Sequence, residues 1–269
     1  GYTMVYGIAK MLNFAHGDII MVGAYAVITT VLTANFPPLV GILVSILVCV
    51  VLGVTIEFLA YRPLRQAPPL SVLITAIGVS YFLQNLALLI FGSEQKAFPT
   101  IIKLPTIEAA GVYIDGITLI TLVVTAVIMV GLTLFINKTR MGKAMRAVSE
   151  DKGAAELMGI SVNRTITITF AIGSALAAVA ALFYGMSYIY IRPTTGSMPG
   201  IKAFTAAVFG GIGSIPGAML GGLLLGVIEI FAGAYISTQL QNAIVFAVLI
   251  VVLLVKPAGL LGKMVQEKV

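Results

Sequence analysis

Residues 19–56 contain no charged side chain. About 20 mainly apolar residues form a helix long enough to cross the hydrocarbon core of a bilayer. The stretch therefore accommodates two crossings, separated by Pro37 and Pro38, because proline cannot continue a helix interior. Only 10% of the 269 residues are charged and the mean hydropathy is +1.09, whereas about 25% of the residues in a soluble domain are charged. The sequence therefore predicts an integral protein of the lipid bilayer.

Further apolar runs of similar length follow along the chain. With the first stretch, they cover residues 19–36, 39–60, 70–91, 116–136, 165–191, 203–228 and 230–255. These runs predict an all-α, polytopic bundle of about eight transmembrane helices, which forms a single domain over residues 1–269. Residues 1–9 are apolar but too short to span, and we expect them to be the end of a first helix whose beginning is missing.

The distribution of Lys and Arg predicts the orientation of the bundle, since both are enriched in short cytoplasmic loops. The most basic segment is 138–164, which we place in the cytoplasm. Two other groups share that side: Arg62 with Arg65, and Lys256 with Lys263 and Lys268. The loop 92–115 balances Lys96 and Lys103 with three carboxylates, and we place it outside.

This orientation requires an odd number of crossings after residue 191. Residues 217–236 and 239–255 supply only two, so a third, broken helix is expected near 202–217. Residues 210–217 read GGIGSIPG and interrupt it. Non-helical backbone at membrane depth is tolerated only inside protein or beside a water-filled cavity, so we expect this break to be buried or to line a path.

The cytoplasmic segment 138–164 also predicts a short helix at 150–158. Ser149 is a good N-cap residue, and Glu150 and Asp151 then lie in the first turn, where carboxylates stabilise the helix dipole. Gly159 occupies the position at which glycine commonly ends a helix.

This short helix has an apolar end, formed by Leu157, Met158 and Ile160. Such an end suits insertion into a groove of a partner protein. The alternative interpretation is a solvated connecting loop.

Three polar residues, Asn13, His16 and Asp18, precede the first long apolar run. One interpretation is that Asn13 and His16 line a substrate path. In the alternative, Asp18 caps a helix that begins near Ile19, and His16 satisfies free backbone groups. No nucleophile accompanies His16 in the sequence, which argues against a catalytic set.

Two carboxylates lie in apolar surroundings, where a charge at the helix centre costs about 2.5–3.5 kcal/mol. Glu57 is close to a cytoplasmic end, where Arg62 or water is within reach. Glu229 is deeper in its run, where it would either face a path through the protein or pair with a residue of a neighbouring subunit.

Several segments together resemble the permease subunits of branched-chain amino-acid ABC importers. Residues 12–23 read LNFAHGDIIMVG, residues 150–160 read EDKGAAELMGI and residues 209–222 read FGGIGSIPGAMLGG. Residues 153–159 resemble the Glu-Ala-Ala-x-x-x-Gly coupling loop of ABC importer permeases, with Gly153 in place of Glu. Residues 61–65, YRPLR, match the form that pairs with a second, homologous permease.

The resemblance implies transport of leucine, isoleucine and valine across a bacterial inner membrane, and it extends to urea and short-amide importers. It also implies three kinds of partner: a homologous second permease, two cytoplasmic ATP-binding subunits and a periplasmic substrate-binding protein. The implied ATPase-coupling residues are Glu150, Asp151, Ala154, Ala155, Leu157 and Gly159, and the substrate-path candidates are Asn13, His16 and Glu229.

We expect no enzyme activity, cofactor, metal or nucleic-acid partner for this chain itself. The sequence contains no G-x-x-x-x-G-K-[ST] motif, so ATP hydrolysis would belong to another polypeptide. Two rival functions remain from the residues alone. One is an ion-coupled secondary transporter that uses Glu229, Asp18 or His16, and the other is an intramembrane hydrolase.

Overall fold

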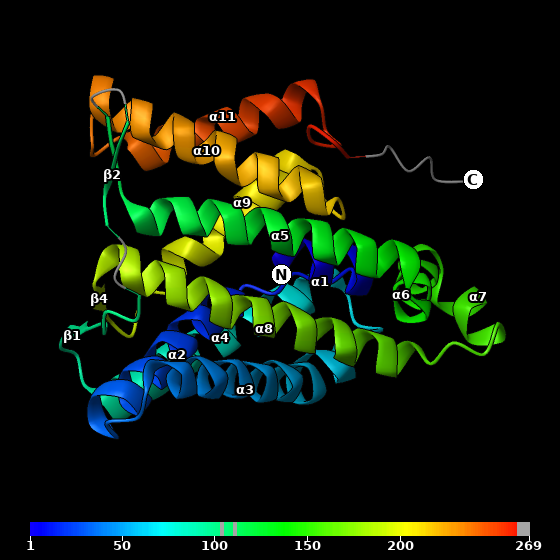
Figure 1. Ribbon diagram of the computed structural model, residues 1–269. Coiled ribbons are helices and arrows are strands. Elements are labelled where there is room, and N and C mark those ends of the chain that lie inside the picture. Colours follow the sequence, from blue (N-terminus) through cyan, green and yellow to red (C-terminus); the bar gives the residue numbers. More distant parts are fainter. Residues whose placement is uncertain (103–104, 110–111, 263–269) are drawn as a thin grey trace.

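The computed structural model describes residues 1–102, 105–109 and 112–262, and this part of the chain is mainly helical (Figure 1). The helices are α1 (Tyr2–Ala9), α2 (His16–Ile28), α3 (Pro38–Ile56), α4 (Pro69–Phe91), α5 (Gly116–Lys138), α6 (Arg140–Glu150), α7 (Lys152–Leu157), α8 (Val162–Tyr188), α9 (Ser197–Gly210), α10 (Ile215–Tyr235) and α11 (Gln241–Val255). A π-helical turn, η1 (Thr29–Thr33), extends α2, and α3 continues through η2 (Glu57–Tyr61) and η3 (Arg62–Leu64). The predicted all-α, polytopic fold is confirmed.

Six helices in the described part of the chain are long and apolar enough to cross a membrane. They are His16–Thr33, Pro38–Leu64, Pro69–Phe91, Gly116–Lys138, Val162–Tyr188 and Ile215–Tyr235. The bounds of the first five follow the predicted uncharged runs closely, because hydropathy fixes which residues occupy the bilayer. The sixth agrees with the helix expected at 217–236 after the glycine-rich break. The chain is therefore a multi-pass membrane protein.

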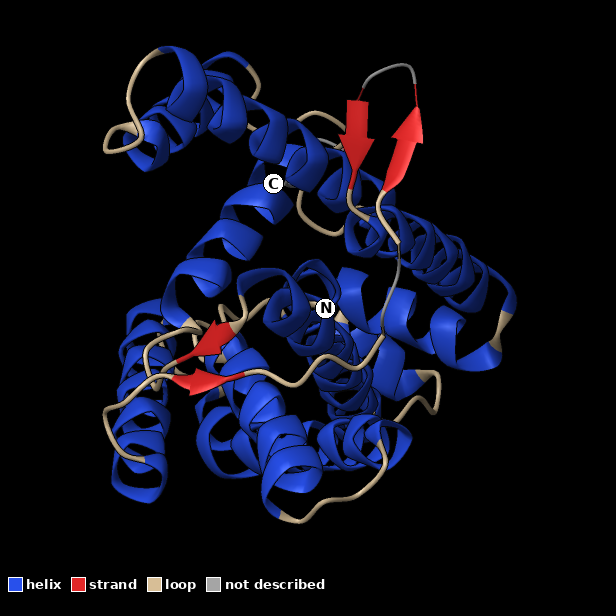
Figure 2. Cartoon of the chain, turned by 60° about the vertical axis from the view of Figure 1, so that its left-hand side comes forward, coloured by secondary structure: helices blue, strands red, loops and turns tan. Residues whose placement is uncertain are grey.

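The short strands lie at one end of the bundle, and α6, α7 and residues 256–262, which follow α11, lie at the other (Figure 1). Figure 2 shows the strands as two separate pairs. One pair joins β1 (Lys96–Ala97) to β4 (Tyr190–Ile191), and the other is the hairpin of β2 (Ile107–Ala109) and β3 (Val112–Ile114), both antiparallel. This separation of ends agrees with the predicted orientation, although Lys103, Lys263 and Lys268 lie outside the described residues.

The main core lies where α2, α3 and α8 pack together, and small residues allow the close approach. A Cβ atom added at Gly53 of α3 would lie 1.8 Å from Ser174 Oγ of α8, and one at Gly23 of α2 would lie 2.8 Å from Cys49 Sγ. A second, smaller core joins α9, α10 and α11 through Phe209, Leu225 and Val245. The bundle therefore has a dense centre and a less extensive C-terminal layer.

The chain has two breaks between consecutive helices, one between α9 and α10 and one between α1 and α2, and the two regions lie against each other. The expected break is confirmed at residues 211–214, but α9 begins at Ser197, before the uncharged run. Lys202 is tolerated inside α9 because its ammonium forms an ion pair with Glu229 of α10, at 2.6 Å. The second interruption separates α1 from α2, and Gly7 of α1 lies against Gly213 in the first break.

Candidate functional site

The segment 138–164, which the sequence analysis places in the cytoplasm, contains two short helices, α6 and α7, one more than the sequence predicts. The hydroxyl of Thr139 accepts a hydrogen bond from the Gly142 amide at 3.0 Å and caps α6, and the Asp151 carboxylate accepts one from the Ala154 amide at 3.0 Å and caps α7. The expected cap at Ser149 is wrong, and so is the first turn expected at Glu150 and Asp151, because Glu150 ends α6 and Asp151 is the N-cap of α7. The Ser149 hydroxyl donates to the Arg146 carbonyl within α6, since a serine inside a helix bonds back to the preceding turn.

The tip of α7 is apolar and exposed. Leu157 is 91% exposed and Met158 is 81% exposed. Gly159 ends the helix as expected, with a φ of 79° that favours glycine. Ala154 lies on the exposed side, whereas Ala155 is only 3% exposed and belongs to the main core. Together, these residues form what we call the α7 tip: Ala154, Leu157, Met158 and Gly159.

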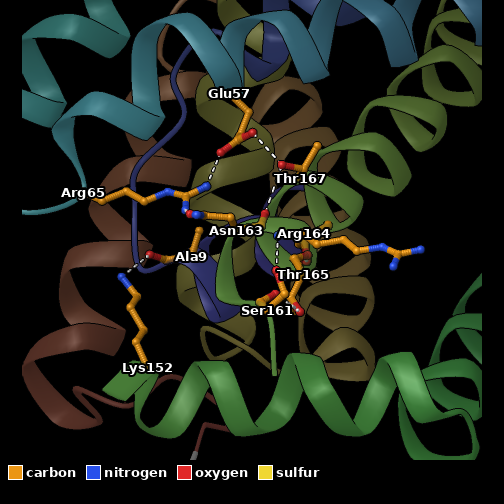
Figure 3. A network of polar contacts seen from close by, with 10 residues as sticks. Ala9, Glu57, Arg65, Lys152, Ser161, Asn163, Arg164, Thr165 and Thr167 are labelled. Carbon is orange, nitrogen blue, oxygen red and sulfur yellow. Dashed lines mark hydrogen bonds and ion pairs between the residues drawn. The ribbon is translucent and has the colours of Figure 1, made fainter. Parts of the chain in front are cut away.

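One face of helix α6 packs against the main core of the protein. Met145 and Val148 are buried in the main core. At the start of α7, the Lys152 ammonium donates to the Ala9 carbonyl of α1 at 3.3 Å (Figure 3). The first residue of α7 is therefore hydrogen-bonded to the end of α1.

A cavity of about 560 Å³, here called the upper cavity, lies between α1, α5, α8, α9 and α10. Its volume is within the range of about 300–1,000 Å³ that is common for small-molecule sites. None of its lining side chains carries a formal charge. Apolar members include Val124, Ile128, Leu176, Val179, Phe183 and Met219, and hydroxyl groups come from Tyr2, Thr3, Thr121, Thr125, Tyr184, Ser187 and Tyr188.

A second cavity of about 390 Å³, the lower cavity, lies toward the end of the bundle that carries α6, and Met145, Arg146 and Ser149 of α6 line it. Thr3 and Ile215 line both cavities. The Gly213 amide donates to the Thr3 hydroxyl at 3.2 Å. The first turn of α1 and the break before α10 therefore separate the two cavities.

Asn13 and His16 are buried near this site but do not line either cavity. Asn13 Oδ1 accepts a hydrogen bond from the Tyr61 hydroxyl at 3.1 Å, whereas Asn13 Nδ2 has no partner among the described residues. The His16 ring packs edge-on against Tyr2, with 5.9 Å between the ring centroids. His16 therefore lies one side chain behind the wall of the upper cavity.

The expectation that Asp18 caps a helix near Ile19 is wrong. Helix α2 begins at His16, and Asp18 lies in its first turn without capping it. Its carboxylate instead accepts hydrogen bonds from Ser80 and, at 3.0 Å, from Gln84 of α4. Asp18 therefore joins α2 to α4.

Glu229 is separated from the other substrate-path candidates. With Lys202 it lines a cavity of about 250 Å³ between α9, α10 and α11, whose lining does not include Asn13 or His16. Glu57 does not use the expected partner Arg62. Its carboxylate contacts Arg65 and accepts a hydrogen bond from Thr167 at 2.8 Å (Figure 3).

Sequence reasoning missed the residues that line the upper cavity. Their positions in five different helices carry no local signal. One hint was present: Thr121 and Thr125 are four residues apart in an otherwise apolar span, and residues four apart share a helix face.

Comparison with known proteins identifies the relatives of this chain. The family described as branched-chain amino acid transport system / permease component matches residues 1–253. The high-affinity branched-chain amino acid transport system permease protein BraD of Pseudomonas aeruginosa is 49% identical, with 100% of this chain and 92% of the relative covered. The corresponding LivH protein of Escherichia coli strain K12 is 44% identical, with coverages of 100% and 91%.

A more distant relative is the probable branched-chain amino acid transport permease protein LivH of Methanocaldococcus jannaschii, which is 28% identical, with coverages of 97% and 86%. No solved structure matches the chain significantly. The family consists of transport subunits, which supports the expected absence of enzyme activity. The chain belongs to the family of branched-chain amino acid transport system permease components.

Proposed function

We propose that this chain is the permease subunit of an ABC importer that moves leucine, isoleucine and valine into the cell. The single observation that carries the proposal is the α7 tip: two large apolar side chains, Leu157 and Met158, exposed beyond the end of the bundle. Lipid does not cover a segment outside the spans, so a partner protein is the natural cover. A short apolar helix end fits a groove on an ATP-binding subunit.

The two cavities supply a path for the substrate. The upper cavity offers apolar walls for a branched side chain and hydroxyl groups for the charged ends of an amino acid. Movement of α6 would alter the lower cavity directly, because Met145 and Arg146 line it. Opening between the cavities requires the Thr3–Gly213 contact to separate.

The finer assignments follow from the same proposal. The six span-length helices, together with α9 and α11, make about eight transmembrane helices. The chain would occupy a bacterial inner membrane as a single domain. It would pair with a homologous permease, two cytoplasmic ATP-binding subunits and a periplasmic substrate-binding protein.

The candidate site residues then take different roles. Glu150, Asp151, Ala154, Leu157 and Gly159 present or shape the coupling surface, and Ala155 supports it from inside. His16 would support the path from behind Tyr2, and Asn13 would act through its hydrogen bond with the buried Tyr61. Glu229 would act through its ion pair with Lys202.

Uptake into proteoliposomes tests the transport class. We expect uptake of radiolabelled leucine to require ATP and the co-purified ATP-binding subunits. Excess isoleucine or valine should compete, and excess urea or acetamide should not. Uptake by the chain alone, driven by an ion gradient, would establish the secondary-transporter alternative instead.

A double variant, Leu157→Ser with Met158→Ser, tests the coupling surface. Burial of a Leu or Met side chain contributes about 1.5–3 kcal/mol, so we expect co-purification of the ATP-binding subunits to fall at least ten-fold. Tyr113→Ser is the matched control, because Tyr113 is 72% exposed on the β3 hairpin at the opposite end of the bundle. Equal recovery of the subunits from the double variant and the control would overturn the coupling assignment.

A further inference from the structure

Three basic side chains meet at a small cavity that the proposed transport cycle does not use. Lys10 follows α1, Arg65 follows η3 and Lys152 begins α7, and all three line a cavity of about 210 Å³. The three residues are far apart in the sequence and come from different elements. We call this cavity the basic cavity.

The positive charge in the basic cavity is only partly balanced. No carboxylate lines it, and among the described residues neither Lys10 nor Lys152 forms an ion pair. Glu57 contacts Arg65, and the nearby Asp151 carboxylate is engaged at the cap of α7. Burial, together with the charges of Arg65 and Lys10, lowers the pKa of Lys152.

Hydrogen-bond donors in the cavity also lack acceptors. Arg65 uses its two terminal nitrogens on Glu57 and Asn163, but its Nε is buried with no partner among the described residues. Figure 3 shows these two contacts and the single bond from Lys152 to the Ala9 carbonyl. An ammonium has three donors, so Lys152 retains two for a ligand. Buried donors in native proteins are nearly always hydrogen-bonded, so the Arg65 Nε favours binding of a ligand with an acceptor atom.

One wall of the basic cavity is apolar and includes the first turn of α4. Leu12, Leu64 and Val72 line it. Val72 is buried, whereas Leu70 and Ile74, on the opposite face of α4, are 64% and 61% exposed, as expected for side chains that face acyl chains. The cavity thus joins cationic donors to a lipid-accessible helix at the basic end of the bundle.

We propose that the basic cavity binds a phosphate-bearing anion, held by Lys10, Arg65 and Lys152. Basic pockets between transmembrane helices on the cytoplasmic side suit lipid phosphate groups, and the apolar wall along α4 would accommodate the adjoining glycerol and acyl carbons. Free inorganic phosphate offers the same acceptor oxygens. Because Lys152 is the first residue of α7, an anion here would also fix the base of the α7 tip.

Native mass spectrometry of the full-length protein, with any subunits that co-purify, provides the test. The protein is equilibrated with mixed phosphatidylglycerol and phosphatidylcholine, and retained phosphatidylglycerol is counted. Each lysine near an anionic headgroup contributes about a five-fold change in affinity. We therefore expect Lys10→Gln with Lys152→Gln to lower phosphatidylglycerol retention by about 25-fold. Arg65 is left intact, so that Glu57 keeps its partner.

Lys143→Gln is the matched control, because Lys143 is exposed on α6 and does not line the basic cavity. Retention of phosphatidylglycerol by the control and its loss from the double variant would establish a lipid headgroup as the ligand. If inorganic phosphate stabilises the detergent-solubilised protein against unfolding, and this stabilisation is lost in the same double variant, the ligand is the free anion. Equal binding of both anions by the wild type, control and double variant would overturn the proposal. This readout does not depend on transport or on the coupling assignment.

Discussion

The two intramembrane carboxylates, Glu57 and Glu229, each pair with a basic side chain but in different surroundings. Glu57 is fully buried, and Arg65, Thr167 and the neighbouring Asn163 form a hydrogen-bonded network with it. The Glu229 and Lys202 side chains are 23% and 32% exposed, and their pair borders a cavity. The first pair lies at the end of α3 and is hydrogen-bonded to Asn163 and Thr167 of α8, whereas the second pair joins α9 to α10.

The backbone is also packed more densely near Glu57 than near Glu229. In α3, a Cβ atom added at Gly53 would collide with Ser174 of α8, whereas one at Gly226 of α10, near Glu229, would meet nothing within 4 Å. Dense packing restricts the Glu57 side chain to one conformation, whereas the open space around Glu229 allows its side chain several conformations. We infer that the first region is the fixed part of the bundle and that the second is able to rearrange.

The largest expected effect comes from Glu57→Leu. Removal of one partner of a buried pair costs about 3–5 kcal/mol, because the other charge stays buried and unpaired. The substitution would leave Arg65 without its carboxylate, and the Thr167 hydroxyl would keep only the Asn163 carbonyl as an acceptor. We expect the free energy of unfolding, measured by titration with sodium dodecyl sulfate, to fall by about that amount.

Arg62→Gln is the control for this measurement, since Arg62 is exposed and lies over the Phe58 ring, 5.3 Å from its centroid. Loss of an exposed cation–π contact costs about 0.5–1 kcal/mol. Similar losses for Glu57→Leu and Arg62→Gln would show that the Glu57 network is not a fixed part of the bundle.

The contrast between the two regions also marks what the sequence was able to predict. Spans were predicted well because hydropathy acts over about 20 consecutive residues. The partners of Glu57 and Asp18 were not, because they depend on packing between helices. Asp18 looked like a local cap, yet Ser80 and Gln84 of α4 bind its carboxylate.

The functional region divides in the same way. Gly159 and the apolar end of α7 were readable from local rules, whereas the start of α7 was misplaced because Asp151 caps it in place of Ser149. Ala155 looked equivalent to Ala154, but the orientation of α7 buries it. The upper cavity left no local pattern, because five helices contribute to it.

An intermediate effect is expected for Gly53→Ala. The new methyl group would overlap Ser174, and overpacking of a well-packed core typically costs about 1–3 kcal/mol. Gly226→Ala adds the same methyl group in open space and should be neutral or raise stability by up to about 1 kcal/mol, because alanine favours helix. Thermal melting in detergent measures both, and equal melting temperatures would contradict the difference in packing.

The smallest effect on stability is expected at the Lys202–Glu229 pair. Partly exposed pairs contribute about 0–1 kcal/mol, so a double-mutant cycle with Lys202→Met and Glu229→Gln should give a coupling energy in that range. The exchanged pair, Lys202→Glu with Glu229→Lys, should retain normal stability because the surrounding cavity accommodates either arrangement. The exchange of Glu57 and Arg65 should fail, since Thr167 and Asn163 are placed for the native order. A coupling energy above about 3 kcal/mol at Lys202–Glu229 would mean that this pair is as fixed as the Glu57 network, and the C-terminal layer would then have to move as a rigid unit.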